Sequence, residues 1–538
     1  MRVAFVPDKF SRGQNETRSG QLLFPMGIEV CIPENDIVRF FAREYENLDY
    51  TNLYTAHGGS LHYSGPGRPP TDPKLLFQVC AFAYANDIYS SRKIEEACRK
   101  RIDFIWLLDG APAPDHTTIA NFRSGQCKEA IEDLFYQHVL YLGRIDATDY
   151  KVGIFDGTKI ESFANRYTFV WRGTVEKNLA KLTDKVEAVF NRLGIQGEIT
   201  KDKLRSVITN KRKRMAELNI EQVHGRGHRK SQLQRDYEEL SSLLEKWLKY
   251  EGQLRTMGSD RNSYSKTDPD ATFFRMKDDH MRNGQLKPGY NFQICVNSEF
   301  ITGLGVYADR NDVNTFEPFM NTLIEKHGQR YEIALADAGY ESLANYRFLN
   351  SIGIDSFIKP ANYDYMKSKK FKKQIGRREN MAYEKSGDYY ICANQRHLLF
   401  AREHTFTSKN GVKQTNMVYR CENCADCLCR QECCKSKDVN KPKEIEVNLE
   451  FIAYREKSLT NITTSYGIQL RTNRSIQVEG AFGVIKQDHH FRRFLCGGIE
   501  KVMSELHLLC IGYNIRKLYR KTMDGRLGQH LFKAKKVS

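Results

Sequence analysis

Residues 152–156 read VGIFD, and residues 333–337 read IALAD. Both are apolar runs of strand length that end in an aspartate, so we interpret each as a buried β-strand with a carboxylate at its end. A third acidic residue, Glu479, lies in the helix-like segment SIQVEGAFGVIK at 475–486. Two carboxylates at strand ends and one on a helix can hold a pair of divalent metal ions if the fold brings them together.

The order of the elements around these aspartates predicts how the sheet is built. We expect further strands over residues 272–276, 290–296, 301–307 and 356–358, and helices over residues 316–327 and 343–351. Residues 297–300 read as the turn of a hairpin. This order, with both aspartates at strand ends, predicts an α/β fold with a ribonuclease-H-like core, in which three antiparallel strands join parallel ones.

The net charge points to a polyanionic partner. The 538 residues include 83 Lys and Arg against 66 Asp and Glu, a formal charge of +17. Such an excess favours a protein that binds nucleic acid over a soluble protein that is merely basic. It also makes phosphates the expected substrate groups for metal ions held by the three acids.

No apolar run approaches the roughly 20 residues that span a bilayer, and the N-terminus lacks the apolar core of a signal peptide. We therefore expect an intracellular protein without a membrane partner. In that setting the 14 cysteines should be thiols or metal ligands and not disulfides.

The core is expected to be interrupted by a helical hairpin over residues 174–256. Apolar stripes at helical spacing run through Leu179–Val189 and Tyr237–Leu254, with a basic loop from Lys211 to Lys230 between them. The basic tip could contact DNA, or it could be a solvated charged end.

Short capped helices are predicted near the N-terminus, starting at Thr71–Pro73, Ser91 and Asp115. They suit either a helix-turn-helix-like DNA module or an ordinary helical bundle. We expect these divisions: an all-helical, DNA-binding domain at 1–145; a ribonuclease-H-like core at 146–365 with its insertion at 174–256; a Lys- and Cys-rich insertion at 366–445; the remainder of the core at 446–520; and a basic tail at 521–538.

Six cysteines fall within 14 residues, between Cys421 and Cys434. This density suggests a structural Zn²⁺ site, for which we select Cys421, Cys424, Cys427 and Cys433. The spacing is not that of an ordinary zinc ribbon. An iron–sulfur cluster and unligated thiols remain alternatives.

The chain resembles the bacterial insertion-sequence transposases of the DDE type. The resemblance rests on FDGTKIE at 155–161, PGYNFQ at 288–293, LADAGY at 335–340 and VEGAFGVIK at 478–486. The segment from Arg68 to Arg123 also looks like the helical domain that precedes the catalytic core in this group.

The resemblance implies that Asp156, Asp337 and Glu479 form a catalytic triad that binds Mg²⁺, with Mn²⁺ as a possible substitute. Lys486 matches the lysine seven residues after the glutamate in a related tyrosine–arginine–glutamate–lysine signature. Arg474 lies one position further from the glutamate than that signature places its arginine. The residues expected to contact DNA are Lys159, Arg471, Arg474, Lys486, Arg492 and Arg493.

The expected activity is cleavage of DNA at the ends of an insertion sequence, followed by transfer of the freed 3′-hydroxyl into target DNA. The partners would be double-stranded DNA, both terminal inverted repeats and target, bound by a dimer in the bacterial cytoplasm at the nucleoid. Two rival functions stay open: a nuclease that only hydrolyses DNA, and a non-catalytic DNA-binding regulator.

Overall fold

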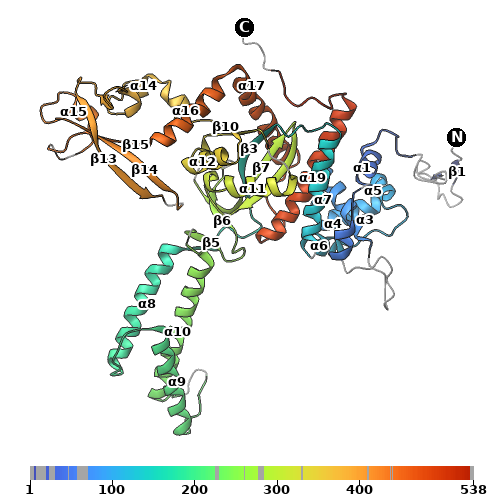
Figure 1. Cartoon of the computed structure of the whole chain (residues 1–538). Helices are drawn as coiled ribbons and strands as arrows, with labels where there is room; N and C mark the ends of the chain where they lie inside the picture. The colour runs from blue at the N-terminus through green and yellow to red at the C-terminus, as the bar shows by residue number, and fades with distance from the viewer. Residues whose placement is uncertain are drawn as a thin grey trace, which may run out of the picture.

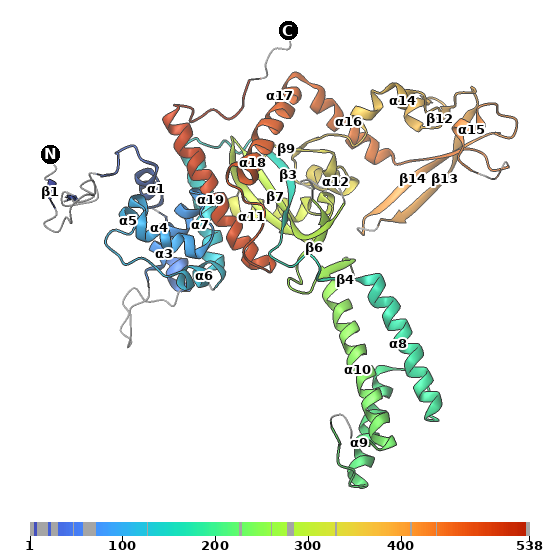
Figure 2. The ribbon, with the colours of Figure 1, turned by 180° about the vertical axis from the view of Figure 1, so that it is seen from behind.

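The computed structural model in Figure 1 describes residues 31–533, except for 47, 57–70, 126, 225–228, 260, 277–283, 329–330, 409–410, 437 and 439, together with the paired strands β1 (Phe5–Pro7) and β2 (Gly20–Leu22). The end of the expected basic tail, after residue 533, lies outside this part. The molecule is mixed α/β, as predicted, with a helical N-terminal region. A helical arm and a β-rich extension leave the central body in different directions (Figures 1 and 2).

The N-terminal helices pack around one long helix from the other end of the chain. They are α1 (Ile37–Glu46), α2 (Thr51–Ala56), α3 (Pro73–Ala85), α4 (Ser91–Lys100), α5 (Ile102–Leu107), α6 (His116–Ser124) and α7 (Lys128–Arg144). Asp72 and Asp115 cap α3 and α6 by accepting backbone N–H groups, as their sequence positions predict. Helix α3 is buried along nearly its whole length, so it cannot be presented to DNA.

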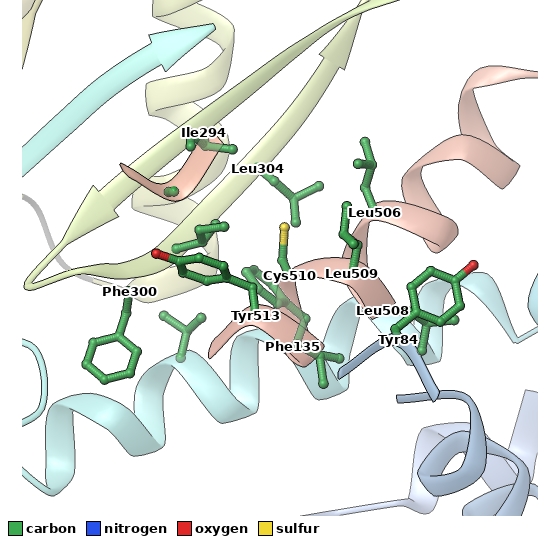
Figure 3. Packing of buried hydrophobic residues seen from close by; sticks show 14 of the residues in the cluster. Tyr84, Phe135, Ile294, Phe300, Leu304, Leu506, Leu508, Leu509, Cys510 and Tyr513 are labelled. Atoms are coloured by element: carbon green, nitrogen blue, oxygen red, sulfur yellow. The ribbon is translucent and has the colours of Figure 1, made fainter. Parts of the chain in front are cut away.

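Helix α19 (Ile499–Met523) joins these helices to the sheet. Figure 3 shows Leu508 beside Tyr84 of α3, and Cys510 and Tyr513 close to Leu304 and Phe300 of the sheet. All of these side chains belong to one continuous hydrophobic core. The helical region and the sheet are therefore packed together as one body.

The central sheet has the strand order β10-β9-β3-β7, with β6 and β8 both pairing with β7. Its strands are β3 (Val152–Glu161), β6 (Thr272–Arg275), β7 (Leu286–Asn297), β8 (Phe300–Tyr307), β9 (Ile333–Ala336) and β10 (Asp355–Ile358). Strands β3, β9 and β10 are parallel, whereas β7 runs antiparallel to its neighbours. Helices α11 (Phe316–His327) and α12 (Leu343–Ser351) connect the strands around β9, over the predicted residues.

The prediction that Asp156 ends its strand is wrong, because β3 continues to Glu161. The extension is caused by β7, which pairs with β3 as far as Glu161↔Gly289. The pairing of β3 with β9 nevertheless stops at Phe155↔Ala336. Asp156 and Asp337 each follow the last residue of that parallel pair, so both lie at the same edge of the sheet.

The arm contains three helices and not the expected two. They are α8 (Arg172–Arg192), α9 (Lys201–Glu217) and α10 (Gln232–Met257). The segment from Lys211 to Arg214 belongs to α9, because the surrounding residues are good helix formers without a Gly or Pro break. The arm has its own core, in which the predicted stripe residues Leu182 and Leu240 pack together. At its base β4 (Phe169–Trp171) pairs with β5 (Ser263–Ser265).

The β-rich extension is an antiparallel sheet of five strands. The strands are β11 (Ala382–Glu384), β12 (Tyr389–Ile391), β13 (His397–Thr407), β14 (Lys413–Cys421) and β15 (Glu444–Val447). Short helices α13 (Tyr363–Met366), α14 (Lys369–Lys372) and α15 (Arg430–Cys433) flank it. Helix α16 (Leu449–Thr463) leads back to the central sheet, where Ser458 donates a hydrogen bond to the carbonyl of Ile358.

Helix α17 (Ser465–Arg474) and α18 (Gly480–Gly483) are separated by a π-helical turn, Ser475–Glu479, and a second π-helical turn follows at Val484–Asp488. These turns are wider than α-helical ones. Regular α-helical spacing therefore does not describe how Glu479 and Lys486 are placed. Among the described residues no helix is long and apolar enough to cross a membrane.

Buried histidines predict that the fold is sensitive to acid. Burial lowers the pKa of His138 and of His507 to about 3, against about 6.5 in an unfolded chain. Their neutral forms therefore support the fold fully above pH 6.5, and this support is lost as the pH falls from 6.5 towards 3. We expect the free energy of unfolding to fall by about 1.4 kcal/mol per pH unit for each histidine in that range. Denaturant titrations at several pH values would measure this slope, and an equal slope in a His138→Leu/His507→Leu variant would contradict it.

Candidate active site

The three acidic residues selected from the sequence come together around one guanidinium group. Arg474 Nη2 lies 2.9 Å from Asp156 Oδ2 and 3.6 Å from Asp337 Oδ2, and Arg474 Nη1 lies 3.8 Å from Glu479 Oε1. The carboxylates come from β3, from the end of β9 and from the π-helical turn after α17. One cation thus offsets part of the repulsion among the three negatively charged carboxylates.

The three carboxylates differ in how firmly they are held. The exposed fractions of the side chains are 16% for Asp156, 41% for Asp337 and 60% for Glu479. Asp337 Oδ1 accepts the N–H of Gly339 at 2.7 Å, whereas Glu479 contacts Ser475 Oγ at 3.0 Å within its own helical turn. Asp156 is therefore the most enclosed of the three carboxylates and Glu479 the most exposed.

The site suits a cation, although it is not a finished metal cage. Within the described part of the chain, no group of three or more His, Cys, Asp or Glu side chains is arranged to hold a metal ion. Arg474 shows that the three carboxylates can share one positive charge. Oxygen donors of this kind are the ligands that Mg²⁺ and Mn²⁺ prefer. Metal binding would require Arg474 to withdraw from the carboxylates.

A fourth carboxylate, Asp312, lies beside the three and was not selected from the sequence. Its Oδ1 accepts from Asn291 Nδ2 at 2.8 Å, from Gln293 Nε2 at 2.8 Å and from Lys159 Nζ at 3.0 Å. Asn291 and Gln293 are fully buried. The PGYNFQ motif was the available signal, but nothing in the sequence connects it to residue 312.

Tyr340 completes the polar layer that Asp312, Asn291 and Gln293 form beside the aspartates. Burial, followed by the carboxylates of Asp312, Asp156 and Asp337, raises the pKa of Tyr340 well above its usual value. Its hydroxyl therefore stays protonated and donates to Gln293 Oε1. Gly157 leaves room for the same layer, because a Cβ there would meet Gln293 Nε2 at 2.1 Å.

Most basic residues expected at DNA are engaged with the protein. Lys486 Nζ donates to Thr158 Oγ1 at 2.6 Å and to the carbonyl of Lys159 at 3.1 Å. Arg493 donates to the carbonyls of Ser162, Phe163 and Ala164. Lys486 and Arg493 therefore attach the segment after Glu479 to β3.

The other two candidates also have protein contacts. Arg492 donates to the carbonyl of Lys486 and to Gln487. The guanidinium of Arg471 lies over the ring of Tyr363, 5.4 Å from its centroid. This distance is within the roughly 6 Å of a cation–π pair. These two residues thus help to order the chain on either side of the acidic cluster.

The cysteine cluster gathers around a small cavity of about 10 Å³ at one end of the five-stranded sheet. Cys421, Cys424 and Cys433 pack together there, and Cys392, which precedes the turn between β12 and β13, joins them. Burial and the neighbouring Cys424 raise the pKa of Cys421 to about 12. Cys392 was missed because 29 positions separate it from the run of cysteines that begins at Cys421.

A mixed α/β fold that gathers carboxylates at one edge of its sheet is suited to metal-assisted phosphoryl transfer. Residues 391–519 match the family described as "Transposase DDE domain", and residues 28–125 match the family described as "Transposase domain (DUF772)". The chain is a DDE-type transposase of the insertion-sequence kind. The first match includes Glu479, and neither match includes Asp156 or Asp337. No curated protein and no solved structure gives a match.

Proposed function

We propose that Asp156, Asp337 and Glu479 are the catalytic carboxylates of this DNA transposase and hold two Mg²⁺ ions, which Mn²⁺ can replace. The observation that supports this most directly is their convergence on Arg474. Bound metal ions would activate the attacking oxygen and neutralise charge on the phosphate. Asp156 and Asp337 form the rigid part of the site, and the exposed Glu479 adjusts to the substrate.

We also propose that the core has the ribonuclease-H-like plan. In support, the strand order β8-β7-β3-β9-β10 combines three antiparallel strands with two parallel ones, and the two aspartates follow the central pair. The division into domains at 1–145, 146–365, 366–445 and 446–520 follows from the same plan. Helix α19 connects two of these domains, because it packs on both the N-terminal helices and the sheet.

The reaction proposed is hydrolysis at the terminal inverted repeat, followed by attack of the freed 3′-hydroxyl on target DNA by a dimer that holds both ends. Arg474, once released from the carboxylates, would stabilise the charged phosphate in the transition state. Lys486 holds β3 against the helix that carries Glu479, so it positions the site from the protein side.

The test is a cleavage and joining assay with Mg²⁺, a labelled duplex that carries the element's end, and a supercoiled target plasmid. We expect cleavage and joining, both lost without a divalent metal. Cutting without joining would favour a nuclease. End binding without any chemistry in Mg²⁺ or Mn²⁺ would contradict the proposal and favour a non-catalytic regulator.

For the cysteine cluster we propose a structural Zn²⁺ ion held by Cys392 with three of Cys421, Cys424, Cys427 and Cys433. The thiols line one cavity, and the N–H of Lys443 lies 3.3 Å from Cys424 Sγ, where it would stabilise a thiolate. Because no three of these sulfurs already lie at metal-binding positions, binding must draw them closer.

This proposal predicts one equivalent of zinc in protein purified under reducing conditions. Cys392→Ser is expected to lose the metal, because a serine hydroxyl is a poor zinc ligand. Cys510→Ser, a buried cysteine of α19, is the matched control and should keep it. Metal analysis of the purified proteins measures this, and a wild-type chain without zinc would leave the cysteines as unligated thiols.

A further inference from the structure

We propose that the helical arm is a clamp for the backbone of duplex DNA, with α9 at its tip and a basic cleft at its base. This inference rests on the proposed function, since it assumes that the substrate is double-stranded DNA. It goes further by assigning a contact surface on the arm, which extends away from the central sheet (Figure 2).

The tip of the arm carries positive charge that the protein does not neutralise. Helix α9 carries four consecutive cations, Lys211 to Arg214, shortly before it ends at Glu217. Lys211 turns inwards and pairs with Asp236 at 3.0 Å. The other three are exposed, and within the described residues none of them forms an ion pair. Three adjacent cations repel one another, so the arrangement favours an external polyanion.

Several acidic residues of the arm pair with cations other than these three. Arg192 pairs with Glu239 at 2.5 Å, Lys201 with Glu251 at 2.7 Å, and Lys230 with Glu238 at 2.6 Å. These pairs hold the three helices together. The helix C-terminus itself favours a cation in the last turn, where Arg214 lies, but that effect does not account for Arg212 and Lys213.

The arm is built to hold its tip in place. Its helices share a separate apolar core, and a second small cluster that includes Val175 and Met257 fixes the base. Arg172 donates a hydrogen bond to the carbonyl of Arg261, which attaches α8 to the segment between α10 and β5. A loop that only carried solvated charges would need neither an apolar core nor a fixed base.

A cleft of about 560 Å³ lies where the arm meets the central sheet. It is lined by Arg255, Arg261 and Arg310 among other residues. The loop at its rim includes Asn311, next to Asp312, whose carboxylate belongs to the polar layer beneath the acidic cluster. The lining of the cleft and the polar layer of the candidate active site therefore contain adjacent residues of the chain.

The length of the arm matches the repeat of DNA. Helix α10 has 26 residues, which corresponds to about 39 Å. One turn of B-DNA is about 34 Å, or roughly 10 base pairs. A duplex lying along the arm would meet cations at the cleft and again about one turn further on.

The test compares wild type with the variant Arg212→Glu/Lys213→Glu/Arg214→Glu on a duplex that carries the element's end, without catalytic metal. We expect loss of hydroxyl-radical protection about one helical turn beyond the cleft. The slope of log Kd against log salt concentration should fall by about 2 to 3, and binding at about 0.1 M salt should weaken at least tenfold.

Two further variants keep the result interpretable. Lys369→Glu/Lys370→Glu/Lys372→Glu on α14 changes the net charge equally and should keep the protection at the arm. Arg212→Gln/Lys213→Gln/Arg214→Gln should reproduce the loss with normal folding, measured by circular dichroism. Unchanged protection and salt slope in the glutamate variant would overturn the proposal, as would loss of dimerisation with unchanged DNA contacts. A wild type that binds but cuts no DNA would count only against the proposed function.

Discussion

Asp337→Asn is expected to reduce the rate of DNA cleavage by at least about 10³-fold, because the site loses a charged ligand for the metal ions. Asparagine has nearly the same shape, and its side-chain oxygen can still accept the N–H of Gly339, which Asp337 Oδ1 accepts at 2.7 Å. The fold should therefore be preserved. Single-turnover cleavage of a labelled end in Mg²⁺ measures the effect.

Asp355→Asn is the matched control for this variant. Asp355 begins β10, the strand beside β9, and pairs with Lys457 at the surface at 3.1 Å. Its replacement also removes one carboxylate but should leave cleavage close to the wild-type rate. A rate for Asp337→Asn within tenfold of wild type, at normal stability, would remove Asp337 from the catalytic set.

Arg474→Ala is expected to have the second largest effect. It should lower the cleavage rate without weakening metal binding, whereas loss of a purely structural residue would impair both. Cleavage should slow by about 10²-fold, because a positive charge beside the scissile phosphate is lost. The dissociation constant for Mn²⁺ should stay the same or decrease, because the guanidinium that competes for the three carboxylates is gone. Titration calorimetry with Mn²⁺ and single-turnover kinetics measure the two quantities.

The metal-free protein supplies an independent readout for the same variant. Without Arg474 the three carboxylates repel one another, so the metal-free Tm should fall and the rise in Tm on adding Mn²⁺ should grow. Arg474→Lys keeps one charge and should lie between the two proteins. Weaker Mn²⁺ binding by Arg474→Ala would show that Arg474 supports the metal site and does not compete with the metal.

Local patterns were sufficient to predict the regular elements of the core. Helices α11 and α12 and strand β9 occupy the predicted residues, since their apolar spacing and their caps are properties of neighbouring positions. The errors occur where pairing with a distant strand, or the helix propensity of neighbouring residues, determines the extent of an element. Strand β3 runs past Asp156 because β7 pairs with it, and α9 includes a basic segment that looks like a loop.

The site could be predicted only in part, because its contacts connect distant positions. The three acids selected from the sequence do lie around one arginine, and their catalytic role stays a prediction. The position of Arg474 depends on a contact with Asp156 across 318 positions. Asp312 and Cys392 have no local signal, since each becomes informative only when the sheet brings it beside the motif that it completes. The two π-helical turns around Glu479 are likewise invisible to a pattern based on regular helices.

The central claim is that metal ions held by Asp156, Asp337 and Glu479 contact the scissile phosphate. The most direct test replaces one non-bridging oxygen of that phosphate by sulfur, in each of the two stereochemical forms, and measures single-turnover cleavage in Mg²⁺ and in Mn²⁺. Because sulfur binds Mg²⁺ poorly and Mn²⁺ better, we predict that one form is cut slowly in Mg²⁺ and recovers in Mn²⁺. Equal rates for both forms in both metals, or cleavage that persists in a chelator, would contradict the account.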